Sequence, residues 1–295
     1  MGQDLCQQDD TARQILTCAD QISGLPISKL CFEGPMPELT QTVNLQPAVT
    51  AVNLAFLSAV RKANIQPKVC AGHSLGEYSA LCAAGVVSIK DCLRLVLKRG
   101  ELMHREATRY TGAMSAVVGL TIEKVSAIVD QSSQTGIVAV ANHNSAEQIV
   151  ITGAPEAVAA AGKAAADQGA KAIALKVSGA WHSPLIKGAE DHFKAFLEGI
   201  EFSPPQCEVI HNVTAAPEPD PQQIKSLMAR QLCSPVRWYD SILKMIENHT
   251  EIYVEIGPGR VLTGLLKKIL PTGSNARVYN VYDLKTLDAF LQTEG

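Results

Sequence analysis

The order of hydrophobic periodicities between residues 111 and 178 constrains the fold of this chain most strongly. Stretches with strand-like alternation are separated there by two stretches with helical spacing, the second rich in alanine. The expected elements are a strand at 113–120, a helix at 121–130, strands at 137–142 and 148–152, a helix at 155–168 and a strand at 172–177. This order is that of a ferredoxin-like unit.

The flanking sequence has a different pattern, in which short apolar strands alternate with helical stretches. We expect strands at 69–71, 209–212 and 252–256 and a long helix at 89–107. Such alternation is typical of a parallel sheet covered by helices.

We therefore predict an α/β protein with a discontinuous large domain, residues 1–110 and 179–295, and a small α+β subdomain inserted at 111–178. A cleft is expected between the two domains. The 295 residues, 46% hydrophobic and 19% charged, suffice for a full core.

Charge and cysteine content exclude several classes of protein. The formal net charge is -3, so we expect no nucleic-acid partner. The eight cysteines lack any C-x-x-C pair, which indicates free thiols in a reducing compartment. The first ten residues are polar and acidic, unlike a signal peptide, and no apolar run approaches the length needed to span a bilayer. These features predict a cytoplasmic monomer without a membrane partner.

A G-x-S-x-G pattern at Gly72, Ser74 and Gly76 follows a short apolar strand and precedes a helix. A serine on such a tight strand-to-helix turn exposes its hydroxyl, and the N–H of Leu75 is placed to receive an oxyanion. The alternative is a glycine-rich turn with a capping serine. We predict that Ser74 is a nucleophile.

A serine nucleophile needs a base, and seven histidines compete for that role. His182 is favoured because it follows the last strand of the inserted subdomain, where the chain returns across the expected cleft. The alternative is a histidine that makes an ordinary polar contact. No H-E-x-x-H or other ligand spacing occurs, so we assign no metal.

Chain order distinguishes this arrangement from the α/β-hydrolases. Their triad runs serine, acid, histidine, with the histidine late in the chain. Here a complete inserted unit separates Ser74 from His182, and 295 − 182 = 113 residues follow the histidine. A Ser-His pair oriented by main-chain carbonyls fits better than a triad with an aspartate.

Arg99 lies on the apolar stripe of the helix at 89–107. Cys92, Val96, Arg99 and Met103 recur there at helical spacing on one face. A guanidinium directed inward requires an anionic partner. That partner is either a structural carboxylate or a ligand.

The sequence Gly72-His-Ser-Leu-Gly-Glu-Tyr-Ser-Ala-Leu81 resembles the malonyl-CoA:acyl carrier protein transacylases, the free-standing and modular acyltransferases of fatty-acid and polyketide synthesis. The resemblance covers nearly the whole chain. It continues at Arg99-Gly100, Met103, Gly112-Ala-Met114, Asn142-His-Asn-Ser145, Gln148 to Gly153, His182, Asn212, Arg230-Gln-Leu232, Pro235-Val236, Trp238 and Glu255 to Gly264. It implies a hydrolase-like domain with a ferredoxin-like insertion.

The resemblance also implies a role for individual residues. Ser74 would carry the acyl group and His182 would deprotonate it, while Arg99 would bind the malonyl carboxylate. Gln231 would help to hold the histidine. Met103 and Trp181 would contact the substrate, and the bulk of Trp181 would disfavour a methylmalonyl group. Malonyl-CoA and an acyl carrier protein are the implied partners, and no cofactor is needed.

The sequence departs from the family at its start. Family members begin with a strand and a Gly-Gln-Gly-Ser-Gln loop that supplies an oxyanion donor, whereas Met1-Gly-Gln-Asp-Leu5 matches the segment after that loop. Gln3 is therefore not the loop glutamine. Two alternatives to malonyl transfer stay open: a hydrolase acting on acyl carrier proteins, and a non-catalytic interaction subunit.

Overall fold

The computed structural model of the chain describes residues 1–177 and 179–294. Its contacts divide the chain into two compact units. The first contains Met1–Gly100, Glu201–Val209 and Met245–Gly295, and the second contains Glu101–Ile200 and Ile210–Lys244. The second unit is thus wider than the expected insertion at 111–178. The expected boundary positions 178 and 295 lie outside the described residues.

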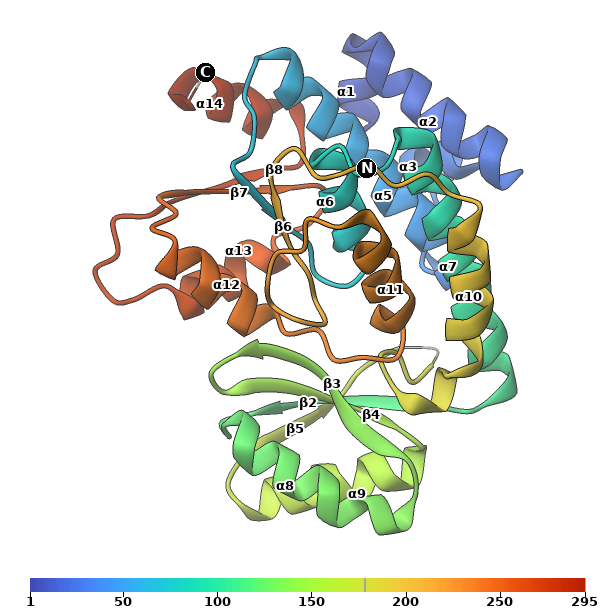
Figure 1. Cartoon of the computed structure of the whole chain (residues 1–295), viewed down its shortest axis with the longest axis vertical. Coiled ribbons are helices and arrows are strands. Elements are labelled where there is room, and N and C mark those ends of the chain that lie inside the picture. The colour runs from blue at the N-terminus through green and yellow to red at the C-terminus, as the bar shows by residue number, and fades with distance from the viewer. Residues whose placement is uncertain (178, 295) are drawn as a thin grey trace. The chain divides into compact units, whose positions relative to one another are not determined.

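The first unit is built around helix α5 (Thr42–Lys62), which is buried along most of its length. Helices α2 (Asp10–Ser23) and α3 (Ile27–Glu33) pack on α5. The other helices of the N-terminal half are α1 (Gln3–Gln8), α4 (Met36–Leu39), α6 (Gly76–Ala83) and the first part of α7 (Ile89–Arg109). The unit ends with α13 (Val261–Ile269) and α14 (Leu284–Glu294) (Figure 1).

Helix α5 differs from the expectation that no apolar run could span a bilayer. By length and composition it could do so, with a mean hydropathy of 1.4 over an 18-residue window. However, 67% of that window is buried inside the protein, as in the core helix of a globular protein.

Two short sheets accompany these helices. Strand β1 (Val69–Ala71) pairs with β6 (Glu208–Ile210). Strand β7 (Ile252–Ile256) pairs in parallel with β8 (Arg277–Val281), from Ile252 opposite Arg277 to Ile256 opposite Val281. The parallel pairing expected from the alternation of strands and helices is therefore present.

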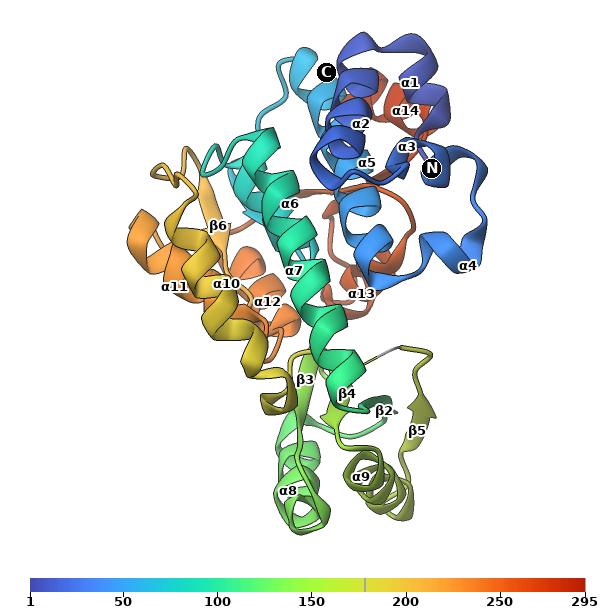
Figure 2. The same ribbon diagram turned by 90° about the vertical axis from the view of Figure 1, so that its right-hand side faces the viewer.

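The second unit contains the ferredoxin-like sheet that the periodicity predicts. Its strands are β2 (Ala113–Val118), β3 (Val138–Ser145), β4 (Gln148–Gly153) and β5 (Lys171–Ala174), in the order β3-β4-β2-β5 with antiparallel neighbours. Helices α8 (Ile122–Ser132) and α9 (Pro155–Asp167) lie on the same face of the sheet (Figures 1 and 2). Alternate strand residues such as Val117, Ile149 and Ile151 are buried against them.

One further segment of the second unit lies against the edge strand β3. Main-chain hydrogen bonds join Val236 to Ala141 and His143, so the segment before α12 (Trp238–Glu247) extends the sheet edge. The unit also contains α10 (Gly188–Glu198), α11 (Pro221–Gln231) and the short 3-10 turns at Ser133–Thr135 and Pro184–Ile186.

Candidate active site

Ser74 lies in the turn between β1 and α6, and its φ of 52° is in the left-handed region. This backbone conformation is costly for any residue with a side chain. A Cβ at Gly72 would overlap the main-chain carbonyl of Gly76, whereas a Cβ at Gly76 would meet nothing within 4 Å. The first glycine of the pattern is thus required by close packing of the turn.

The N–H groups after Ser74 begin helix α6. The Gly76, Glu77 and Tyr78 amides donate to the carbonyls of His73, Ser74 and Leu75. Within the described part of the chain, the Leu75 N–H makes no main-chain hydrogen bond. It also stands beside the positive end of the helix, which suits a donor to a developing oxyanion.

Arg99 is 2% exposed and reaches the nucleophile turn from α7. Its Nη2 donates to Ser74 Oγ over 2.9 Å, and its Nη1 donates to Gln46 Oε1 over 2.9 Å. The guanidinium carbon lies 5.6 Å from the centre of the Tyr78 ring. Burial lowers the pKa of Arg99 from its ordinary value, while Tyr78 and Glu77 oppose that shift.

The hydrogen-bond partners of Arg99 are neutral. Its Nε is buried without a partner among the described residues. The sequence left a structural carboxylate as one possible partner, but the two hydrogen bonds go to an amide and a hydroxyl. Neither hydrogen-bond acceptor is a carboxylate, although the buried Glu77 interacts electrostatically with the guanidinium.

His182 is 3% exposed and also has a left-handed backbone, with φ 59°. Its Nδ1 donates to the main-chain carbonyls of Gln231 at 2.9 Å and Ser234 at 3.1 Å. Because two carbonyl oxygens can only accept, the proton belongs on Nδ1 and the lone pair on Nε2. The orientation by main-chain carbonyls that we expected from chain order is present.

The remaining predicted residues are buried or half-buried in the second unit. Met103 is 3% exposed and continues the buried stripe of α7 beyond Arg99. Trp181 packs on the face of the ferredoxin-like sheet opposite the helices, against Met114, Ala141 and Val150. Gln231 contributes its main-chain oxygen to His182.

The candidate residues are thus divided between the two units. Ser74, Leu75 and Arg99 belong to the first, and His182 and the other predicted residues belong to the second.

Sequence reasoning missed Gln46, and it included Gly112 in the family resemblance without giving it a role in positioning the site. Gln46 is a polar residue in an apolar stretch of α5, and that contrast could have indicated it. Gly112 has no side chain because a Cβ there would overlap the main chain of Ala180, close to His182.

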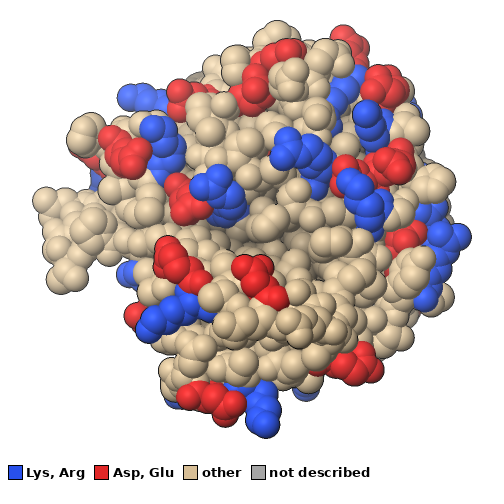
Figure 3. Space-filling model, turned by 60° about the horizontal axis from the view of Figure 1, so that its bottom comes forward, with Lys and Arg blue, Asp and Glu red and all other residues tan. Residues whose placement is uncertain are grey.

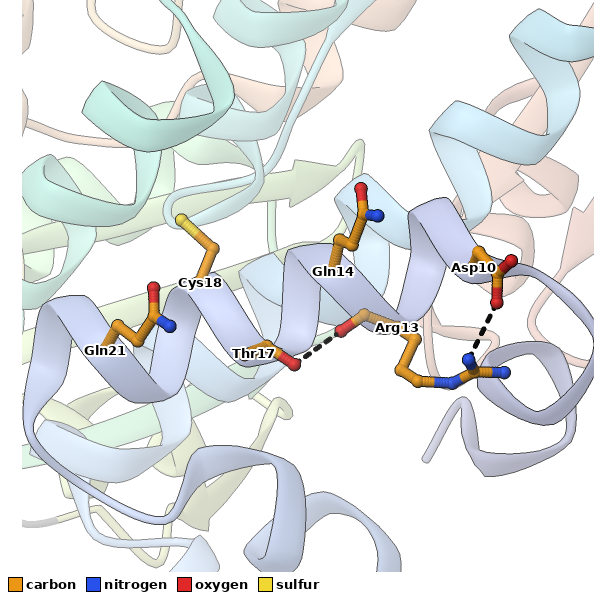
Figure 4. A pocket seen from close by; sticks show the side chains of 6 residues that line it. All are labelled: Asp10, Arg13, Gln14, Thr17, Cys18 and Gln21. Atoms are coloured by element: carbon orange, nitrogen blue, oxygen red, sulfur yellow. Dashed lines mark hydrogen bonds and ion pairs between the residues drawn. The ribbon is translucent and has the colours of Figure 1, made fainter.

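A cavity of about 370 Å³ lies along α2 and is separate from these residues. It is lined by Asp10, Arg13, Gln14, Thr17, Cys18 and Gln21 (Figure 4). An exposed ion pair between Arg13 and Asp10 lies at one end.

The chain belongs to the acyl transferase domain family, whose sequence model matches residues 1–287. Membership of this family is consistent with the division into two units and with the position of Ser74 on a strand-to-helix turn.

Individual relatives narrow the comparison. The malonyl CoA-acyl carrier protein transacylase of Bacillus subtilis is 39% identical over 99% of this chain and 92% of its own length. The malonyl CoA-acyl carrier protein transacylase of Haemophilus influenzae is 37% identical over 92% of this chain and 88% of its own length.

Solved structures similar to this chain are also malonyltransferases. An acyl carrier protein S-malonyltransferase from Vibrio cholerae is 39% identical with a TM-score of 0.93, covering 97% of this chain and 94% of that one. A malonyl-transacylase solved in complex with its type II PKS acyl-carrier protein is 38% identical with a TM-score of 0.94. The match covers 100% of this chain and 95% of that one.

Proposed function

We propose that this chain transfers malonyl groups from malonyl-CoA to the phosphopantetheine thiol of an acyl carrier protein, through an acyl-enzyme on Ser74. The observation that carries the proposal is the environment of Arg99. A buried cation bonded to neutral oxygens, one of them Ser74 Oγ, suits an acyl group that brings its own carboxylate.

In the first half-reaction, Ser74 Oγ attacks the thioester carbonyl and His182 Nε2 takes the hydroxyl proton. The Leu75 N–H stabilises the oxyanion, and coenzyme A leaves with the proton from His182. The malonyl carboxylate replaces Ser74 Oγ as the partner of Arg99 Nη2. In the second half-reaction, His182 deprotonates the carrier thiol, which attacks the acyl-serine, and Ser74 Oγ leaves and takes the proton back from His182.

The other residues shape and support this site. The main-chain carbonyls of Gln231 and Ser234 keep the proton of His182 on Nδ1. We assign Met103 and Trp181 to the substrate side of the site, with Trp181 excluding a branched acyl group. The thioester supplies the driving force, so the reaction needs no cofactor. As domains we propose residues 1–110 with 179–295, and the inserted 111–178.

We also place the protein in the cytoplasm as a monomer that binds neither nucleic acid nor membrane. All eight cysteines are free thiols, which suits a reducing compartment. Basic and acidic side chains are interspersed on the face shown in Figure 3. A phosphate backbone favours clustered Lys and Arg instead.

Intact-protein mass spectrometry after mixing with malonyl-CoA tests the function. We expect a stable increase in mass of one malonyl group, its absence in Ser74→Ala, and its transfer to an added acyl carrier protein. Steady release of malonate to water would indicate a hydrolase. Absence of any adduct would indicate an interaction subunit, and either result would overturn the proposal.

A further inference from the structure

Cys70 and Cys207 form a close pair of thiols that the proposed reaction does not use. Cys70 lies in β1, and Cys207 immediately precedes β6, the strand paired with β1. Their sulfur atoms are 3.6 Å apart, so a bond length of about 2.05 Å would require a movement of about 1.5 Å. The two thiols are therefore close neighbours that are not joined by a disulfide.

The main chain before Cys207 is held in place on the first unit. The Ser203 amide donates to Val86 O over 2.9 Å, and the Gln206 amide donates to Ala84 O over 2.8 Å. A Cβ at Gly85 would lie 2.8 Å from Gln206 Cδ, so the two segments are closely packed. The segment that leads into Cys207 is therefore held against residues 84–86.

The surroundings favour a thiolate on Cys207. The hydrogen bond from Cys70 lowers the pKa of Cys207 to about 7, with a further contribution from the Arg61 guanidinium, although burial opposes the shift. The same hydrogen bond, together with burial, raises the pKa of Cys70. Cys207 is thus the attacking sulfur, because the thiolate is the nucleophilic form.

Cys207 is one of three partly exposed cysteines, with Cys18 and Cys233, whereas its neighbour Cys70 is buried. Cys207 is partly exposed, whereas Cys82 and Cys92 are 3% and 0% exposed. Burial raises the pKa of Cys31 to about 11 and that of Cys233 to about 12. Cys207 therefore combines an accessible sulfur with a neighbouring thiol.

We propose that Cys70 and Cys207 are a modification site at which a hydroperoxide oxidises the two thiols to a disulfide. The Cys207 thiolate attacks the peroxide O–O bond, forming a sulfenic acid and releasing hydroxide. The Cys70 sulfur then displaces the sulfenic hydroxyl, and its proton leaves with that hydroxyl as water. In sum, two thiols and one hydrogen peroxide give one disulfide and two waters.

Peptide mapping of the full chain after treatment with hydrogen peroxide tests this proposal. We expect a crosslink between the peptides that carry Cys70 and Cys207, with the loss of two hydrogens and reversal by dithiothreitol. In Cys70→Ser the reaction should stop at the sulfenic acid of Cys207, which a cyclic dione traps. In Cys207→Ser, the oxidation of Cys70 by peroxide should be about tenfold or more slower than in the unmodified sequence.

Cys82→Ser is the matched control, because it removes a thiol from the fully buried region and should leave the crosslink unchanged. The proposal is overturned if peroxide leaves Cys207 reduced, or if Cys207 is oxidised without a crosslink to Cys70. Iodoacetamide labelling gives a second measure. Cys207 should react with a midpoint near pH 7, and a midpoint at the ordinary thiol value near 8.5 would contradict the assignment of the attacking sulfur.

Discussion

Arg99 Nη1 donates a hydrogen bond to Gln46 Oε1 over 2.9 Å, although the two residues are 53 positions apart in the chain. The bond fixes one side of the guanidinium with a neutral acceptor. A carboxylate at the same place would form an internal ion pair and compete with an anionic substrate.

Gln46→Glu should therefore reduce the preference for malonyl-CoA over acetyl-CoA. We expect the ratio of the two kcat/KM values to fall about tenfold or more, since one ion pair to a charged ligand contributes at least 1.4 kcal/mol. Gln46→Met is the matched control, because it removes the hydrogen bond without adding charge. Equal ratios in both variants would show that the charge at position 46 does not affect selectivity.

Arg99→Ala should remove about 2 to 5 kcal/mol of malonyl-CoA binding or transition-state stabilisation, because the carboxylate loses its partner. Acetyl-CoA has no carboxylate, so its kcat/KM relative to that of malonyl-CoA should rise by about 30-fold to a few thousandfold. Steady-state kinetics with both thioesters measures the change, and Arg99→Lys serves as the variant that retains charge. Unfolding, or equal loss with both substrates, would make Arg99 a structural residue.

His182→Ala should slow acylation of Ser74 by about a hundredfold or more, the contribution expected of a general base. Rapid mixing with malonyl-CoA followed by mass spectrometry gives the rate. His104→Ala is the control, because His104 is an exposed histidine on α7. An unchanged rate in the His182 variant would assign the base to another residue.

Gly72→Ala should destabilise the protein by about 1 to 3 kcal/mol or more, because the added methyl group overlaps the main chain at Gly76. Gly76→Ala places the same methyl group in open space and should be tolerated. Urea unfolding of the two variants measures the difference. Similar free energies of unfolding would mean that the turn can relax.

Trp181→Ser should raise methylmalonyl loading relative to malonyl loading, because a smaller side chain leaves room for an α-methyl branch. The indole packs on Met114, Ala141 and Val150, so some loss of stability is also expected. Competition between the two thioesters, read by acyl-enzyme mass, separates these effects. Unchanged selectivity in a folded variant would leave Trp181 with a packing role.

The elements of the ferredoxin-like sheet could be predicted from sequence because periods of 2 and 3.6 residues are local properties. For the same reason the inward direction of Arg99 on α7 followed from spacing. Its hydrogen-bond partner Gln46 could not be predicted, because a hydrogen bond between residues 53 positions apart depends on tertiary packing. The carbonyl partners of His182 are likewise 49 and 52 positions away and leave no side-chain signature. Helix α5 was missed as a candidate span because Gln46 and Pro47 interrupt its apolar pattern.

The left-handed backbone at Ser74 has a consequence for attempts to engineer this protein. A residue with a side chain in that region costs about 1 to 3 kcal/mol, and glycine relieves most of the cost. Selection for heat resistance alone would therefore favour glycine at position 74. The selected variants would be more stable but would lack the nucleophile. A thermostability screen on this scaffold must score turnover together with melting temperature.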